Sequence, residues 1–181
     1  MRCARTCSSR PPLRSFDQRL VSPIIFLDLD GVLNTGTYTD CWLGNSELLP
    51  GYTDRDRFGL HFTRSAVAYL EELIRETTAE VVISSSWRYE GMPFLEALWT
   101  VRRLPGRLRG MLPLLEDEGY DRGSCLAAWL AEHPVDKYVI IDDTNDFSEA
   151  QQPHLVLTDP ARGIDLTAYQ QAKAVLMAMR A

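Results

Sequence analysis

The chain has 181 residues, a formal net charge of −6 and a pI of about 5.1. This length is typical of a single domain with one core, and the acidic balance argues against general binding of nucleic acid, which requires a positive surface. No apolar run reaches the roughly 20 residues of a membrane helix, and four cysteines without a CxxC pair indicate reduced thiols in a cytoplasmic protein rather than a disulfide or zinc scaffold.

The first 20 residues differ in character from the remainder. Residues 1–20 are basic, contain Pro11-Pro12 and show no hydrophobic periodicity, which predicts a flexible N-terminal tail. Residues 21–181 are then expected to form the single domain. Its first element is the apolar run at residues 24–27, and a run that is apolar at every position is typical of a strand covered on both faces of a parallel sheet.

Strand-like and helix-like segments alternate in the rest of the chain. Residues 35–60 show no clear period and predict a long loop with room for a short hairpin. After it we expect helices at about 64–76 (capped by Thr63), 92–102, 124 onward and 167–179 (with Thr167 and Gln170 in a capping box), strands at 81–83, 138–141 and 155–157, and an irregular segment or short strand before residue 115. This order predicts an α/β fold with a doubly wound, Rossmann-like, mainly parallel sheet and helices on both faces.

Three of the predicted strands end in polar residues suited to phosphate chemistry: Asp28, Ser84 and the pair Asp142-Asp143. In open α/β sheets, ligands bind outside the carboxyl ends of the strands, so we expect these residues to meet in one crevice. Asp30 lies two positions after Asp28 and projects to the same side of an extended segment. Clustered carboxylates repel one another unless a cation lies between them, and a ligand set made of oxygens alone suits Mg²⁺.

The same segments resemble a known family. Ile24–Gly31 (IIFLDLDG) resembles the first motif of phosphatases of the haloacid dehalogenase (HAD) superfamily, Val81–Ser84 the second and Ile140–Asp143 the fourth. The stretches ISSSWR, RGSCLAAWL, VDKYVIIDDTNDF and LTDPARG are similar to the small HAD domain linked to Swiss Army Knife RNA repair systems.

The resemblance implies roles for the strand-end residues. Asp28 is the expected nucleophile, which becomes an aspartyl-phosphate, and Asp30 the expected acid and base, with its backbone carbonyl near the metal. Ser84 is expected to donate a hydrogen bond to a phosphoryl oxygen. Because Asp30 supplies the proton that an ester oxygen needs on leaving, the pattern favours phosphoester hydrolysis over dehalogenation.

The basic residue and the acid pair complete the expected catalytic set. Arg122 is the candidate for the third motif, since its guanidinium suits a transferring phosphoryl group. Asp143 is expected to hold the metal and Asp142 to orient Arg122, although either could be a ligand. Asp146 either reaches the site or caps a turn.

Substrate contacts are less sharply indicated. Ser85 and Arg88 follow Ser84 closely and are candidates for substrate binding, while an exposed Arg88 is the alternative. A nucleic-acid end could lie on a basic cluster with Trp87 or Trp99 stacking on its bases, or the cluster is a solvated helix end; its members are Arg102, Arg103, Arg107 and Arg109. The short insertions predict a capless domain or a minimal cap, and thus an open site.

These observations predict a Mg²⁺-dependent phosphomonoesterase. A phosphorylated nucleic-acid (RNA) terminus is one expected substrate, and a phosphoprotein or a small metabolite are others. Two further hypotheses remain: a receiver-like phosphoacceptor domain, which the order of the motifs disfavours, and a non-catalytic phosphate-binding module. No membrane partner is expected, and the sequence does not indicate the oligomeric state.

Overall fold

The computed structural model describes residues 22–35, 55–115 and 121–178. The tail predicted at residues 1–20 and most of the loop predicted at residues 35–60 lie outside these ranges. The described residues form an α/β fold with a five-stranded, wholly parallel sheet in the order β5-β4-β1-β6-β7. The strands are β1 (Ile24–Leu27), β4 (Glu80–Ile83), β5 (Leu108–Met111), β6 (Tyr138–Asp142) and β7 (Leu155–Leu157). The predicted fold class is therefore confirmed.

Strand β1 lies at the centre of the sheet, as its continuous apolar sequence predicts. It pairs on one side with β4 and on the other with β6, and all four of its residues are fully buried. Side chains alternate between the two faces of a strand. Ile25 and Leu27 accordingly belong to one core cluster and Ile24 and Phe26 to the other.

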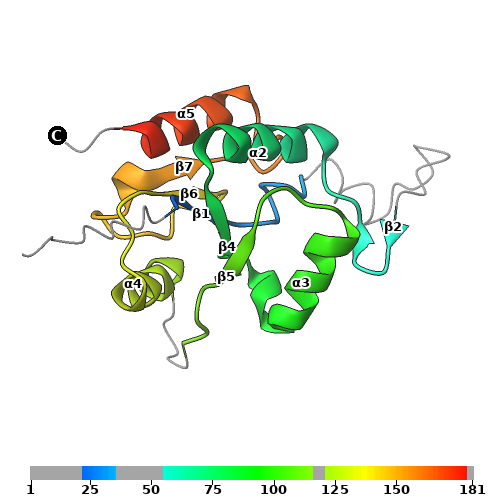
Figure 1. The fold of residues 1–181 in the computed structure, drawn as a ribbon, viewed down its shortest axis with the longest axis horizontal. Helices are drawn as coiled ribbons and strands as arrows, with labels where there is room; N and C mark the ends of the chain where they lie inside the picture. The colour runs from blue at the N-terminus through cyan, green and yellow to red at the C-terminus, as the bar shows by residue number, and fades with distance from the viewer. Residues whose placement is uncertain (1–21, 36–54, 116–120, 179–181) are drawn as a thin grey trace, which may run out of the picture.

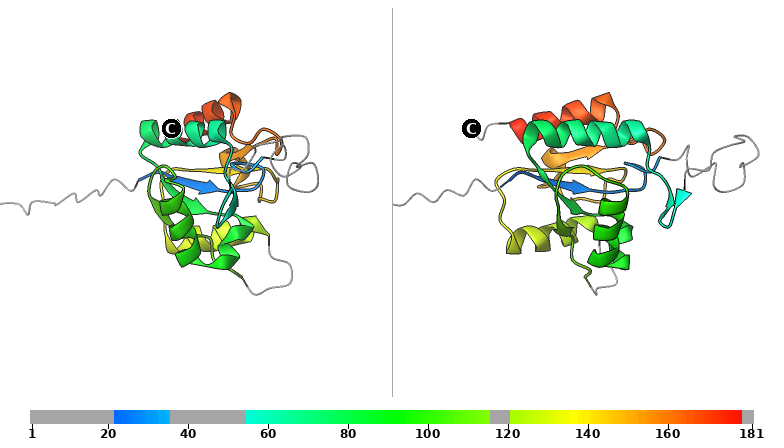
Figure 2. Two further views of the ribbon diagram at one scale, coloured as in Figure 1. Left: turned by 90° about the vertical axis from the view of Figure 1, so that its right-hand side faces the viewer. Right: turned by 45° about the vertical axis from the view of Figure 1, so that its right-hand side comes forward.

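Helices cover both faces of the sheet. Figure 1 shows α2 (Arg64–Thr77) and α5 (Leu166–Met177) side by side on one face, with α3 (Met92–Val101) and α4 (Arg122–Glu132) on the other, and the two views of Figure 2 agree. Trp99 of α3 and Trp129 of α4 are buried, and the Trp129 ring meets Phe26 edge-on at 5.1 Å between centroids. No helix in the described part of the chain combines the length and the apolar character needed to cross a bilayer.

Two helices begin earlier than their sequences suggest, because an aspartate caps each of them. The Asp121 carboxylate accepts a hydrogen bond from the backbone N–H of Ser124, so α4 begins at Arg122 rather than at Ser124. The Asp165 carboxylate accepts from the backbone N–H of Thr167 and Ala168, and replaces the predicted capping box at the start of α5. The first of these shifts places Arg122 in the opening turn of its helix.

The start of α2 also differs from the prediction in one detail. Thr63 occupies the capping position, but its side chain makes no capping hydrogen bond there. Its hydroxyl instead lies 3.0 Å from the hydroxyl of Thr35. This contact ties the start of α2 to the segment that follows β1.

A small hairpin precedes α2, as the sequence allowed. Its strands β2 (Arg55–Asp56) and β3 (Gly59–Leu60) are antiparallel and form a separate two-stranded sheet. The Asp56 carboxylate accepts two hydrogen bonds from Arg102, both 3.0 Å long, at the end of α3. This ion pair fixes the hairpin beside α3 (Figure 1), where it forms a minimal insertion rather than a large cap within the described residues.

Candidate active site

The strand order brings the sequence-predicted acids together at one point of the sheet edge. After β1 the chain runs outward through β4 and β5 and then returns to β6 on the opposite side of β1. Such a reversal is the place where open α/β sheets bind ligands. The backbone N–H of Asp28 donates to Ile141 O at 3.0 Å, and that of Ser84 donates to Leu27 O at 2.9 Å. The parallel ladder therefore holds the ends of β1, β4 and β6 at one level.

Three carboxylates converge at this edge. Asp28, Asp142 and Asp143 each place a carboxylate oxygen within 4.8 Å of the others, and we call them the acidic group. Gly31 makes the approach of Asp143 possible, because a Cβ atom at position 31 would lie 2.2 Å from Asp143 Oδ2. Gly31 also has a φ of 70°, which residues with side chains rarely adopt. The glycine of the first motif is thus required by this close contact as well as by the turn.

Arg122 enters the acidic group from the first turn of α4. Its Nη1 donates to Asp28 Oδ2 at 2.5 Å and also to Asp142 Oδ2. The side chain is 20% exposed, whereas those of Asp28 and Asp142 are almost completely buried. The structure thus brings together the predicted nucleophile, the predicted basic residue and one acid of the predicted pair.

The acidic group carries more negative charge than Arg122 can balance. Burial raises the pKa of Asp142 to about 6, the charge of Asp28 adds to this rise, and Arg122 opposes it. Burial and the charge of Asp28 also raise the pKa of Asp143. Burial favours a lower pKa for Arg122, but the charges of Asp28 and Asp142 outweigh it and raise that pKa. Three carboxylates sharing one guanidinium disfavour full ionisation unless a further cation is present.

The donors of the acidic group fit a hard divalent cation such as Mg²⁺. All are carboxylate oxygens, and two of the three residues are already held in place by the backbone. Asp28 Oδ1 accepts from the N–H of Leu29 at 2.7 Å. Asp142 Oδ1 accepts from the N–H and hydroxyl of Thr144 at 2.9 and 2.8 Å, and its Oδ2 contacts Arg122. Both oxygens of Asp142 therefore accept hydrogen bonds, and so do both oxygens of Asp28, because Asp28 Oδ2 accepts from Arg122. The assignment of Asp143 as the metal ligand of the pair stays a prediction.

Asp30 lies outside the acidic group and is held by two other side chains. Its Oδ1 accepts from Asn34 Nδ2 and its Oδ2 from Trp87 Nε1, each at 2.8 Å. The sequence predicts no role for Asn34 and predicts Trp87 only as a stacking partner. Asn34 could have been found, because the turn at Gly31 brings a residue four positions on back toward Asp30. Trp87 lies 57 positions away and has no comparable signal. The expected metal contact through the Asp30 backbone carbonyl stays a prediction.

The hydroxyl of Ser84 is fully buried and makes no hydrogen bond within the described residues. A buried polar atom without a partner is costly and calls for an explanation. Its position at the end of β4, level with Asp28, is where the resemblance places the donor to a phosphoryl oxygen.

The structure gives Ser85 and Arg88 tasks other than the predicted substrate contacts. Both are fully buried. Ser85 precedes a short 3₁₀ helix (Ser86–Glu90) and accepts a 3.4 Å hydrogen bond from the Trp87 N–H. Arg88 Nη1 donates to the carbonyl oxygens of Ser84 and Ser85, both at 2.9 Å. Because a fully buried guanidinium has no surface to offer a substrate, we assign Arg88 to holding the loop that carries Ser84.

Acids balance the basic cluster after α3 only in part, because two carboxylates contact three of its four arginines, and its role as a nucleic-acid surface stays a prediction. Arg102 is paired with Asp56 and is only 2% exposed. Arg107 and Arg109 both donate to Glu80, at 2.9 and 3.1 Å. Trp99 is not available to stack on a nucleic-acid base, because its side chain is buried in the core.

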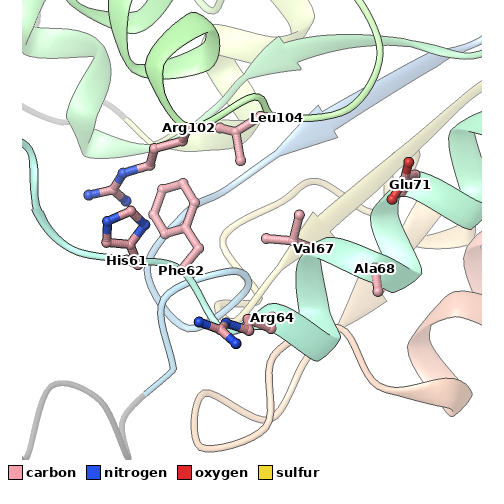
Figure 3. Close-up of a pocket in the computed structure, with 8 residues that line it drawn as sticks. All are labelled: His61, Phe62, Arg64, Val67, Ala68, Glu71, Arg102 and Leu104. Carbon is pink, nitrogen blue, oxygen red and sulfur yellow. The ribbon is translucent and has the colours of Figure 1, made fainter. Parts of the chain in front are cut away.

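Figure 3 shows where Arg102 lies instead. It lines a pocket of about 390 Å³ together with His61, Phe62 and the start of α2. His61 Nε2 lies 3.9 Å from Asp56 Oδ2, so the charge partner of Arg102 lies near this pocket without lining it. No residue of the acidic group lines it. Asp146 is likewise no member of the acidic group, and its backbone oxygen accepts from the N–H of Gly123 at 3.0 Å.

Comparison with known proteins identifies the domain. No curated protein and no solved structure shows a significant match to the chain. A family model described as the HAD domain in Swiss Army Knife RNA repair proteins matches residues 24–168. This span covers most of the chain and includes the acidic group, Asp30, Ser84 and Arg122. Together with the parallel sheet and the acids at its edge, this match shows that the chain belongs to the family of HAD domains found in Swiss Army Knife RNA repair proteins.

Proposed function

We propose that this HAD domain is a Mg²⁺-dependent phosphomonoesterase that forms an aspartyl-phosphate on Asp28 and acts on the phosphorylated ends of nucleic acid. The observation that supports the chemistry is the environment of Asp28. Its carboxylate lies at the sheet reversal within 4.8 Å of two further acids and contacts Arg122. Family membership supports activity of the phosphatase type, and the family's description as RNA repair suggests the substrate.

The metal would be held by Asp28 and Asp143, with the backbone carbonyl of Asp30 beside them. Bound there, Mg²⁺ supplies positive charge that offsets the repulsion between the carboxylates and an incoming phosphate. Asp142 holds Arg122 through the Oδ2 contact. Arg122 then faces the phosphoryl group with a guanidinium whose raised pKa keeps it charged at all ordinary pH values.

In the first half-reaction a carboxylate oxygen of Asp28 attacks phosphorus. The new bond joins this oxygen to phosphorus, and the bond between phosphorus and the ester oxygen breaks. Asp30 in its protonated form gives its proton to the departing ester oxygen, which leaves as an alcohol. Arg122 and the Ser84 hydroxyl donate to the phosphoryl oxygens, where charge is concentrated in the transition state.

In the second half-reaction water hydrolyses the aspartyl-phosphate. Asp30, now a carboxylate, takes a proton from the water while the water oxygen attacks phosphorus. The bond between the Asp28 oxygen and phosphorus breaks, and inorganic phosphate leaves. Asp28 returns as a carboxylate and Asp30 as the acid for the next cycle. The hydrogen bonds from Asn34 and Trp87 keep the Asp30 carboxyl in one orientation through both steps.

Hydrolysis of p-nitrophenyl phosphate in the presence of Mg²⁺ tests the nucleophile. Asp28→Asn is expected to abolish turnover, while the exposed control Asp159→Asn leaves it unchanged. Turnover that survives Asp28→Asn would end the assignment. An aspartyl-phosphate on this chain that persists for hours without turnover would favour the receiver-like alternative. Binding of phosphate esters without turnover would favour a non-catalytic module.

Leaving-group dependence tests Asp30 separately. p-Nitrophenolate leaves without much help from a proton, whereas the alkoxide of a nucleotide needs one. Asp30→Asn should therefore slow hydrolysis of a phosphorylated oligonucleotide far more than hydrolysis of p-nitrophenyl phosphate. An equal loss on both substrates would contradict the role of Asp30 as the acid.

A further inference from the structure

A second pocket, which we call the aromatic pocket, lies beside Asp30. It has a volume of about 470 Å³, within the range of about 300–1,000 Å³ that small-molecule sites occupy. The hairpin turn, the 3₁₀ helix after Ser85 and the start of α3 form its walls. Its lining residues are Arg57, Phe58, Ser86, Trp87, Glu90 and Phe94.

Three aromatic rings form the apolar part of this pocket. The rings of Phe58 and Phe94 meet edge-on with centroids 5.2 Å apart, and those of Trp87 and Phe94 lie 6.2 Å apart. All three side chains are only partly buried. The guanidinium of Arg57 lies 4.7 Å from the centre of the Phe58 ring. Aromatic rings accompanied by an arginine are the groups on which nucleic-acid bases stack.

The position of Trp87 connects the aromatic pocket to the chemistry. Its Nε1 donates to Asp30 Oδ2 at 2.8 Å, and the same indole lines the pocket. In the proposed function, on which this inference rests, Asp30 protonates the ester oxygen that leaves. The part of the substrate attached to that oxygen therefore lies next to the indole and can enter the pocket.

We propose that the aromatic pocket binds the base of the terminal nucleotide that carries the scissile phosphate. The rings stack on the base, and the exposed polar residues Ser86 and Glu90 offer a hydroxyl and a carboxylate to the donor groups on its edge. Arg57 is exposed and pairs with the negative backbone next to the base. A phosphotyrosine ring would use the stacking walls but has no edge donors for Glu90, so the polar rim favours a nucleobase.

The pocket is held in shape before any base enters. Asp56 Oδ1 accepts from the N–H of Phe58 at 2.7 Å, and the same carboxylate is bound by Arg102. These bonds fix the hairpin turn that carries Phe58 and Arg57. A preformed stacking site loses less affinity to the ordering of its side chains than a flexible one.

Binding to the otherwise intact Asp28→Asn chain tests the inference without requiring turnover. Fluorescence anisotropy would compare labelled oligonucleotides with a terminal phosphate on a normal nucleotide or on an abasic one, at the 5′ end and at the 3′ end. Stacking of one base is worth about 1–3 kcal/mol, so the base is expected to tighten binding by roughly 5- to 150-fold at one of the two ends. Phe94→Leu should bring this ratio close to one.

Two controls separate the pocket from the fold and from the catalytic site. Tyr89→Leu removes an exposed aromatic residue of the same 3₁₀ helix that does not line the pocket, and should keep the ratio. In the active chain, Tyr89→Leu should also leave hydrolysis of p-nitrophenyl phosphate unchanged, because Tyr89 belongs neither to the pocket nor to the acidic group. Should Phe94→Leu prove unstable, Glu90→Gln, an exposed position, should lower the ratio, because Glu90 is the carboxylate proposed to accept from the edge of the base.

The outcomes distinguish this inference from the proposed function. Equal affinities for base-bearing and abasic ends in the Asp28→Asn chain would overturn the base pocket, even if the active chain hydrolyses p-nitrophenyl phosphate. If the active chain hydrolyses no phosphate ester but the affinity of the Asp28→Asn chain still depends on the base, the proposed function is overturned and the base pocket is supported. A phosphotyrosine peptide whose binding depends on Phe94, with no effect of the base, would assign the pocket to phosphoprotein instead.

Discussion

Arginine and aspartate meet in two regions of the molecule with different results. One is the acidic group, and the other is the ion pair between Asp56 of the hairpin and Arg102 at the end of α3, which we call the hairpin junction. At the junction Arg102 meets a single aspartate through two hydrogen bonds of 3.0 Å and lies against the Phe62 ring at 4.5 Å. In the acidic group one nitrogen of Arg122 is shared by Asp28 and Asp142, and a third carboxylate lies close by. Matched charges make a structural contact, whereas an excess of carboxylates makes a site that gains stability from a bound cation.

The largest expected effect comes from removing Arg122. Arg122→Met should lower kcat/KM for p-nitrophenyl phosphate by about 10²–10³-fold, or roughly 2.7–4 kcal/mol, because a donor to the charge of the transition state is lost. The loss should appear mainly in kcat. Steady-state kinetics at saturating Mg²⁺ measure it, and a change of less than about threefold would remove Arg122 from the catalytic set.

Removing Arg102 should lower the stability of the protein rather than its activity. Arg102→Met leaves Asp56, which is only 16% exposed, without its partner. Breaking a buried pair costs about 3–5 kcal/mol, and the partial exposure of Asp56 puts the expected loss near the lower end. The melting temperature should fall by roughly 6–12 °C.

The activity of Arg102→Met provides the contrast with Arg122→Met. Hydrolysis of p-nitrophenyl phosphate, measured well below the melting temperature, should stay within about twofold of wild type, since the hairpin contributes no residue to the acidic group. A catalytic loss as large as that of Arg122→Met would show that the junction and the acidic group act as one unit. Arg102 would then contribute to catalysis as well as to stability.

Binding of Mg²⁺ at the acidic group should stabilise the folded protein. A ligand bound to the folded state alone adds about 2.7 kcal/mol at a concentration of 100 times its Kd. The melting temperature of the wild type should therefore rise with Mg²⁺, and Asp143→Asn should remove most of this rise. Without metal, Asp143→Asn should be at least as stable as the wild type, because burial and the charge of Asp28 already disfavour the ionised carboxylate. A full Mg²⁺ response in Asp143→Asn would exclude this residue as a ligand.

The sequence predicts the sheet and most of the acidic group because both depend on local patterns. Continuous apolar runs give β1 and β6, and a parallel sheet necessarily aligns the residues that follow its strands. The contact of Asp30 with Trp87 and the burial of Arg88 depend on contacts across the fold. Nothing local to Trp87 indicates that its indole reaches a carboxylate 57 positions away. The pairing of the basic cluster has the same origin, since Asp56 and Glu80 are distant from it in sequence.

The smallest expected effect is the acid sensitivity of the hairpin junction. The hydrogen bond from Arg102 lowers the pKa of Asp56 below its ordinary value of 3.8, and burial opposes this only in part. A carboxylate whose pKa is lower in the folded state stabilises the protein above the unfolded pKa, and this contribution is lost as the pH falls through the folded pKa. In urea titrations, the difference in unfolding free energy between wild type and Asp56→Asn should therefore be full near pH 5 and should shrink near pH 3.

A surface pair gives the matched control for this last prediction. Glu72 and Arg75 are neighbours on α2 with exposed side chains, and Arg75 also lowers the pKa of Glu72. Because solvent and salt screen an exposed pair, the difference between wild type and Glu72→Gln should be close to zero in about 0.5 M salt, whereas that of Asp56→Asn should persist there. If the Asp56→Asn difference vanishes in salt as well, the junction behaves as a surface pair. Arg102 would then contribute through its packing on Phe62 rather than through its charge.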